Sequence, residues 1–104
     1  MDIIVYRHHK ADAIKDACNL VEKLRAVVAP NNLIVMLSGT TIYANDIRID
    51  FRCEHIYNLA GLRPDYYETD LYDASEFLAQ SAAKCGGKEL SSLDDIVTIV
   101  TGGN

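Results

Sequence analysis

Acidic and tyrosine side chains are concentrated in one segment of this 104-residue chain, between residues 65 and 76. The segment holds five of the fifteen acidic residues and three of the six tyrosines, and it has no lysine or arginine. Clustered carboxylates steer basic molecules toward a protein, and tyrosines provide large contact areas at interfaces. We therefore predict a partner-binding surface formed by Asp65, Tyr66, Tyr67, Glu68, Asp70, Tyr72, Asp73 and Glu76. The alternative is a solvated sheet edge followed by a helix cap at Asp73.

Histidine and cysteine residues form a second group, because imidazole and thiolate are common zinc ligands. Cys53 and His55 lie two residues apart on a predicted strand, and His8 and His9 follow the first predicted strand. Adjacent parallel strand ends would bring the two pairs together. The chain has no C-x-x-C or H-x-x-x-H spacing, however. We predict no metal and no other cofactor; if zinc binds, its ligands would be Cys53, His55 and one or both of His8 and His9.

Signatures of nucleophilic enzymes are missing from the chain. Ser38 and Gly39 follow a predicted strand, but no G-x-S-x-G elbow is present and no cysteine has a flanking catalytic pattern. We therefore predict no catalytic residue, and we expect Gly39 to close a turn.

The stretch from Gly61 to Asp70 resembles part of the P-loop motor proteins. In that family a Gly-hydrophobic-Arg-x-Asp sequence leads into an apolar strand whose final carboxylates hold Mg²⁺ and polarise the attacking water. The matching residues are Gly61, Leu62, Arg63, Pro64 and Asp65, followed by the strand 66–70. The resemblance implies a metal-binding role for Asp70, but Leu71 replaces the next acid and no G-x-x-x-x-G-K-[ST] loop occurs. It therefore implies a P-loop scaffold that does not hydrolyse nucleotides.

An enzyme is the alternative function that the sequence leaves open. Arg7, His8, His9 and Lys10 lie between the first predicted strand and helix, and a helix N-terminus can bind an anion through its N–H groups. A small metal- or nucleotide-dependent enzyme derived from a P-loop fold would use this loop together with Asp70.

In size, acidity and absence of motifs, the chain resembles the small α/β proteins with which bacteriophages inhibit host defence, such as anti-CRISPR proteins. The resemblance implies a non-catalytic inhibitor that occupies the basic surface of a host nucleic-acid-binding effector. The charge distribution agrees with an acidic binding protein. Residues 1–52 hold seven Lys/Arg and six Asp/Glu, and residues 53–104 hold three and nine, so the net charge of −5 arises in the second half. No basic stripe is present for direct binding of nucleic acid.

The composition predicts one compact cytoplasmic domain. A hydrophobic content of 49% in 104 residues is enough for a single core. No apolar run approaches the roughly 20 residues that span a membrane, and the sequence shows no signal-peptide pattern. Three cysteines in such a chain predict reduced thiols rather than a disulfide framework.

Hydrophobic periodicity predicts an α/β fold with a mixed sheet and two main helices, in the order β-α-β-β-β-α-β. The expected strands cover residues 2–7, 33–37, 47–54, 66–70 and 96–100, and the expected helices cover residues 11–28 and 74–85. Because the 33–37 run is apolar throughout, we expect it to be a central strand covered on both faces.

Local signals place the turns and caps of these elements. Asn45 and Asp46 predict a turn before the 47–54 strand. Asp73 and Glu76 have the spacing of a capping box for the second helix. Cys18 and Cys85 extend the apolar stripes of their helices, so we expect both to lie in the core.

Overall fold

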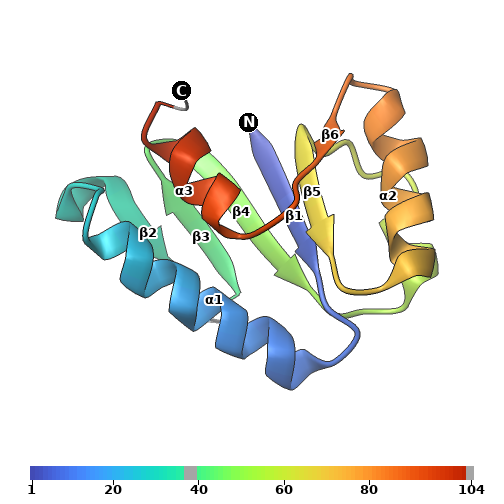
Figure 1. Ribbon diagram of the computed structural model, residues 1–104, viewed down its shortest axis with the longest axis horizontal. Helices are drawn as coiled ribbons and strands as arrows, with labels where there is room; N and C mark the ends of the chain where they lie inside the picture. Colours follow the sequence, from blue (N-terminus) through green and yellow to red (C-terminus); the bar gives the residue numbers. More distant parts are fainter. Residues whose placement is uncertain (37–39, 103–104) are drawn as a thin grey trace.

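Six strands and three α-helices make up the part of the chain that a computed structural model describes, residues 1–36 and 40–102 (Figure 1). In chain order they are β1 (Asp2–Tyr6), α1 (Lys10–Arg25), β2 (Leu33–Val35), β3 (Thr41–Ala44), β4 (Ile47–Arg52), β5 (Tyr66–Thr69), α2 (Tyr72–Ala83), β6 (Lys88–Glu89) and α3 (Asp94–Val100). Two 3₁₀ turns, η1 (Pro30–Asn32) and η2 (Ile56–Leu59), connect them. The predicted α/β class with a mixed sheet is confirmed.

The sheet has the strand order β2-β3-β4-β1-β5-β6. β1 pairs in parallel with β4 and β5, whereas β3 is antiparallel to both β2 and β4. The β-branched run Ile3, Ile4 and Val5 forms β1, and each of its side chains is at most 4% exposed. Such a run is typical of a strand covered on both faces, so β1 is the central support of the fold.

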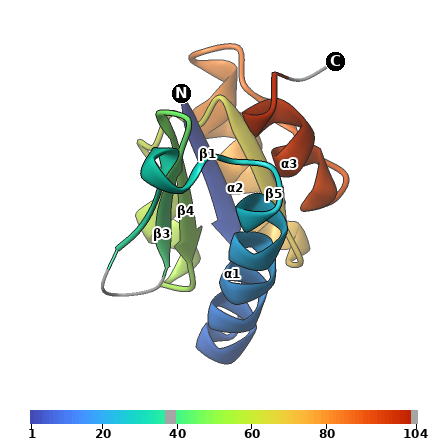
Figure 2. The ribbon, with the colours of Figure 1, turned by 90° about the vertical axis from the view of Figure 1, so that its left-hand side faces the viewer.

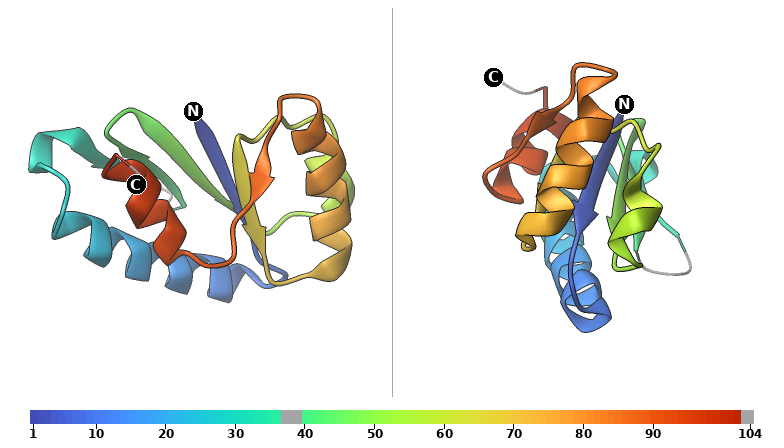
Figure 3. Two further views of the ribbon diagram at one scale, coloured as in Figure 1. Left: turned by 45° about the horizontal axis from the view of Figure 1, so that its top comes forward. Right: turned by 90° about the vertical axis from the view of Figure 1, so that its right-hand side faces the viewer.

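α1 and α3 cover one face of the sheet (Figures 2 and 3). The buried residues of α1 recur at helical spacing and are Ala13, Ala17, Leu20, Val21 and Leu24. They pack in one core with Ile3 and Val5 of β1 and with Ile96 and Val100 of α3. This core fixes α1 against the sheet.

α2 and η2 cover the opposite face, over the central and right-hand strands of Figure 1. Ala74, Leu78 and Ala82 of α2 pack there with Ile4 of β1 and Tyr67 of β5. The chain therefore has two cores, one on each side of β1.

β2 is an edge strand, so the prediction of a central strand at 33–37 is wrong. Ile34 and Val35 are 56% and 40% exposed. β3, which the sequence analysis missed, pairs with β4 through the turn at Asn45 and Asp46 and takes the place next to it. Both turn residues have positive φ, at 49° and 68°, which confirms the predicted turn. Leu37, Ser38 and Gly39 lie outside the described residues.

The run 96–100 is helical, so the predicted last strand is also wrong. α3 buries Ile96 and Val100, which are four residues apart, against the α1 core. The carboxylate of Asp95 accepts hydrogen bonds from the backbone N–H groups of Ser91 and Ser92 just before the helix. Burial of one helical face therefore outweighs the β preference of the isoleucines and valines.

The predicted N-cap at Asp73 is wrong by two residues. α2 begins at Tyr72, its N-cap residue is Leu71, and no side chain caps it. Asp73 lies inside the first turn, where a carboxylate is favoured by the helix dipole. Its side chain therefore remains available at the surface.

Both helix cysteines are exposed, so their predicted core positions are wrong. Cys18 is one residue past the buried stripe position Ala17, which turns it about 100° away from the sheet. Cys85 lies two residues past the end of α2, and its thiol donates a hydrogen bond to the carbonyl of Pro64 at 3.2 Å.

We expect both thiols to react with a bulky reagent in the native protein. Labelling followed by mass spectrometry should modify Cys18 and Cys85 before Cys53, which is half-buried. Protection of Cys18 from a reagent that labels the unfolded chain would contradict the placement of α1.

Among residues 1–36 and 40–102, no helix combines the length and apolar character needed to cross a membrane.

Candidate binding surface at the carboxyl edge of the sheet

The carboxyl ends of β1, β4 and β5 meet at one edge of the sheet, because these strands are parallel neighbours. At this edge β1 leads into α1 and β5 leads into α2 (Figure 1). The two helices pack on opposite faces, so the chain diverges between β1 and β5. Ligands of open α/β sheets bind at such points. We call the surface formed by residues 8–9, 53–57 and 70–76 the carboxyl edge.

A hollow of about 430 Å³ lies at the carboxyl edge. Its lining comes from all three strand ends and consists of Tyr6, His8, Cys53, Glu54, His55, Ile56, Leu71 and Asp73. Three of the residues considered for zinc, His8, Cys53 and His55, therefore line one space. His9 is not part of the lining, and its ring contacts that of His8 edge-on at 4.5 Å.

These residues do not form a cluster of potential metal ligands in the described part of the chain. β4 ends at Arg52, so Cys53 and His55 leave the strand on which they were predicted. His55 caps η2, and its Nδ1 accepts a hydrogen bond from the Tyr57 N–H at 3.3 Å. Within the described residues, no group of three or more His, Cys, Asp or Glu side chains could hold a metal ion.

Tyr6 anchors the floor of the hollow. Its hydroxyl donates a hydrogen bond to the backbone carbonyl of Glu54 at 2.6 Å, which ties the end of β1 to the loop after β4. Burial raises the pKa of the Tyr6 hydroxyl, and electrostatic interactions with Cys53, Glu54 and Asp70 raise it further. The phenol therefore stays protonated and keeps this hydrogen bond over the neutral range.

Arg7 connects β1 to α1 and β5 beneath the carboxyl edge. Its Nε lies 2.7 Å from Asp16 Oδ2 and its Nη2 lies 2.5 Å from Glu68 Oε2. The Arg7 side chain is only 8% exposed, and that of Glu68 is 14% exposed. Burial lowers the pKa of Arg7, but the hydrogen bonds and charges of Glu68 and Asp16 outweigh it and raise this pKa.

Both carboxylates bind the guanidinium of Arg7 inside the protein, with consequences for two predicted roles. Arg7 is not free to bind an external anion, as a nucleotide-dependent enzyme would require of this loop. Glu68 is likewise not free to attract a basic partner.

Asp70 contacts the loop between β1 and α1. Its Oδ1 accepts a hydrogen bond from the backbone N–H of His8 at 3.2 Å. This carboxylate therefore lies near the N-terminus of α1, where a bound phosphate would sit in a nucleotide-binding α/β protein. A negative charge at this place repels an anionic ligand and favours a cationic one.

The structure divides the predicted acidic and tyrosine surface into two parts. Asp65 is at the other end of β5, where its carboxylate accepts a hydrogen bond from the Asp2 N–H at 2.8 Å. Tyr66 packs against the α1 core, and Tyr67 is buried beneath α2. With Glu68 bound to Arg7, the exposed remainder is Asp70, Tyr72, Asp73 and Glu76.

The carboxyl edge also contains an exposed aromatic residue that the sequence analysis missed, Tyr57, beside the predicted Tyr72. The Tyr57 ring stacks on His55 at 4.7 Å and meets Phe77 edge-on at 5.4 Å, and Tyr57 is 66% exposed. Tyr72 is 75% exposed, and its hydrogen bond with Glu76 raises the pKa of its hydroxyl. No hydrophobic periodicity points to Tyr57, because it lies in the short 3₁₀ turn η2, whose buried residue is Leu59.

Comparison with known proteins returned no match. No protein-family model, curated protein or solved structure matches this chain. The comparisons therefore favour no particular function.

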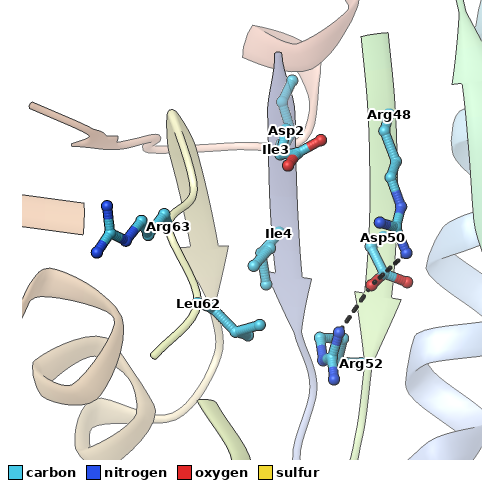
Figure 4. A pocket seen from close by; sticks show the side chains of 8 residues that line it. All are labelled: Asp2, Ile3, Ile4, Arg48, Asp50, Arg52, Leu62 and Arg63. Carbon is cyan, nitrogen blue, oxygen red and sulfur yellow. Dashed lines mark hydrogen bonds and ion pairs between the residues drawn. The ribbon is translucent and has the colours of Figure 1, made fainter. Parts of the chain in front are cut away.

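A second, smaller hollow of about 70 Å³ lies on the opposite side of β1 and β4 from α1 (Figure 4). Arg48 and Arg52 line it, and both contact the Asp50 carboxylate between them, at 3.7 and 2.9 Å. Arg52 also forms an ion pair with Glu54. The Arg63 side chain extends away from β4. These guanidinium groups do not converge on a shared anion position, so we do not assign a ligand to this hollow.

Proposed function

We propose that the protein is a non-catalytic binding protein whose carboxyl edge binds a basic protein partner. The observation that carries the proposal is the position of the Asp73 carboxylate. Its carboxylate lines the hollow and forms no ion pair or hydrogen bond with the residues described here. Asp70 and Glu76 add negative charge beside it, and two exposed tyrosines, Tyr57 and Tyr72, border the same surface.

This combination fits an arginine or lysine side chain of a partner. A guanidinium forms charge-assisted hydrogen bonds with a carboxylate, and cations bind to the faces of aromatic rings. Glu54 contributes less than Asp73, because Arg52 already neutralises it. Lys10 at the start of α1 is a basic residue near the edge, and it lowers the local negative charge without cancelling it.

The resemblance to phage inhibitors extends the proposal to the partner. A host nucleic-acid-binding effector of the CRISPR type presents a basic surface to its nucleic acid, and an acidic edge that occupies this surface would block it. Under this proposal the carboxyl edge competes with nucleic acid for the effector.

Replacing Asp73 by lysine is expected to weaken binding to a basic partner at least tenfold, because it puts a cation where the partner's cation binds. The measurement is affinity capture of partners from a bacterial lysate, followed by titration of a purified partner at several salt concentrations. The matched control is Glu22→Lys. It makes the same charge change near the other end of α1, at an exposed residue with one surface ion pair.

Equal affinity of the folded Asp73→Lys protein and the wild type would contradict this surface. An affinity that does not fall as the salt concentration rises would also contradict this surface, because ions screen attraction between exposed charges.

The enzyme alternative remains a proposal with a separate test. Asp70 and the buried Arg7 both argue against nucleotide binding at the β1–α1 loop. Hydrolysis of ATP or GTP with Mg²⁺ that disappears in an Asp70→Ala variant would favour the enzyme instead.

A further inference from the structure

Large apolar side chains are exposed together at the outer edge of the sheet, on β2 and the residue after it. Ile34, Val35 and Met36 are 56%, 40% and 47% exposed. A hollow of about 340 Å³ adjoins this edge and is lined by Arg25, Val28, Pro30 and Leu33. β2 lies at the left edge of the sheet in Figure 1, away from α2 and from the strand β6 at the other edge.

The backbone of β2 is paired on one side only. The Met36 N–H donates to the Thr41 carbonyl, and the Asn45 N–H donates to the Asn32 carbonyl, so alternate residues 32, 34 and 36 face β3. Since antiparallel ladders alternate, the N–H and carbonyl of Val35 point outward. β2 is the terminal strand of the described sheet, so no strand covers these groups.

The two edges of the sheet differ in the way they are protected. β6 has only two residues, Lys88 and Glu89, and short charged strands are a common protection against edge-to-edge pairing. The run 33–36 contains no charged residue. An exposed apolar edge of this kind is suited to pairing with another strand.

We propose that β2 pairs in antiparallel fashion with β2 of a second copy of this chain, which gives a two-fold symmetric dimer with one continuous sheet. A two-fold contact places the same surface on both sides, so it is favoured where that surface carries no net charge. Residues 1–52 sum to +1 (seven minus six), whereas residues 53–104 sum to −6 (three minus nine). The strands of the acidic half, β5 and β6, lie at the opposite edge of the sheet, and the run 33–36 itself has no charged residue. Two copies can therefore meet at β2 without bringing these strands together, and a strongly charged partner would find no complementary charge on the run.

The topology also determines what such a dimer presents. β2 is parallel to β4, because β3 is antiparallel to both, and β4 is parallel to β1 and β5. Antiparallel pairing of two β2 strands directs the two carboxyl edges to opposite ends of the continuous sheet. The dimer would hold two binding surfaces facing away from each other, and the pairing itself does not depend on the function proposed for them.

The first test is the mass of the purified protein in solution, measured over a wide range of concentrations in a reducing buffer, because Cys18 and Cys85 are exposed. We expect twice the chain mass of 11.5 kDa at high concentration. Val35→Lys should remain monomeric at concentrations where the wild type is dimeric. The matched control is Ile14→Lys, which places the same cation on an exposed residue of α1, 40% exposed, and should leave the dimer intact.

A second measurement needs no variant. Hydrogen exchange of the Val35 N–H should slow as the protein concentration rises, whereas exchange of the Met36 N–H, already bonded to Thr41, should change little. A mass of 11.5 kDa at every concentration would overturn the proposal. A dimer that persists in folded Val35→Lys, with no concentration dependence at Val35, would also overturn it.

Discussion

Arg7→Met is expected to lower the free energy of unfolding by about 3 kcal/mol, near the lower end of the cost of breaking a buried ion pair, because it leaves two partly buried carboxylates without their cation. Asp16 and Glu68 lie 2.7 and 2.5 Å from the guanidinium, and the Glu68 side chain is 14% exposed. Domains of this size have a total stability of about 5–15 kcal/mol. The loss should therefore be plain in urea denaturation followed by circular dichroism.

The matched control for Arg7→Met is Arg25→Met. Arg25 pairs with Glu22 at 2.9 Å, but the two side chains are 63% and 71% exposed. Exposed pairs of this kind contribute less than about 0.5 kcal/mol. If the two variants lost equal stability, the Arg7 network would be no stronger than a surface ion pair.

A third variant separates lost charge from lost packing. In the triple variant Arg7→Met, Asp16→Asn, Glu68→Gln, no charge remains to be left unpaired, so much of the lost stability should return. A triple variant as unstable as Arg7→Met alone would show that the aliphatic part of Arg7, rather than its charge, holds α1 and β5 to β1.

The Arg7 network also shows why the charge of a segment cannot be judged from the segment alone. The stretch 65–76 has no basic residue, and the sequence analysis treated its acids as uncompensated. In the fold, β1 and β5 are neighbours, and Val5 is opposite Glu68. Arg7, two residues after Val5 and just past the end of β1, therefore reaches Glu68 from 61 positions away. Only knowledge of the strand order could have predicted this compensation.

The period of the strand explains how the predicted surface divides. Successive side chains of β5 point to opposite faces of the sheet. Tyr67 therefore packs beneath α2, while Tyr66 and Glu68 turn toward the α1 side. The residues after the strand, from Asp70 onward, are free of this alternation and gather at the carboxyl edge. The predicted residues that are exposed, Asp70, Tyr72, Asp73 and Glu76, are therefore those that follow β5.

The elements that were predicted well are those with a buried stripe or run. α1, α2 and β4 bury residues at the period of their own structure, and β1 is a continuous buried run, so composition and spacing locate them. β2 and α3 were misassigned because apolar β-branched runs look alike whether they form a buried strand, an exposed edge or a short helix. Their environment is decided by the hairpin of β3 and β4 and by the α1 surface that α3 covers.

Gly87→Ala is expected to lower the free energy of unfolding by about 3 kcal/mol or more. Overpacking a well-packed site costs about 1–3 kcal/mol, and the contacts here are closer than usual. A Cβ at this position would lie 2.1 Å from the Pro64 carbonyl oxygen and 2.9 Å from the Ala82 Cβ. The first of these is a backbone atom that cannot rotate away. The segment after α2 must therefore shift, and this segment begins β6.

Hydrogen exchange can locate the damage caused by Gly87→Ala. The Lys88 N–H donates to the Asp65 carbonyl at 3.0 Å, and the Leu90 N–H donates to the Tyr67 carbonyl at 2.7 Å. Both amides should exchange faster in the variant. The matched control is Gly86→Asn, because Gly86 has open space around it and asparagine tolerates its positive φ of 75°. An Ala variant no less stable than this control would mean that the chain at Pro64 can move.

The same variant distinguishes the scaffold from the proposed binding surface. Ala82 contacts the new methyl group, whereas Tyr72 and Asp73 at the carboxyl edge are ten or nine residues earlier in α2. At 1.5 Å per residue the two ends of the helix are about 15 Å apart. Gly87→Ala should therefore lose stability but keep its affinity for a basic partner below its melting temperature. Asp73→Lys should do the reverse and lose affinity, while its loss of stability should be limited to the roughly 0.3–1 kcal/mol of a charge near a helix N-terminus, because the side chain is exposed.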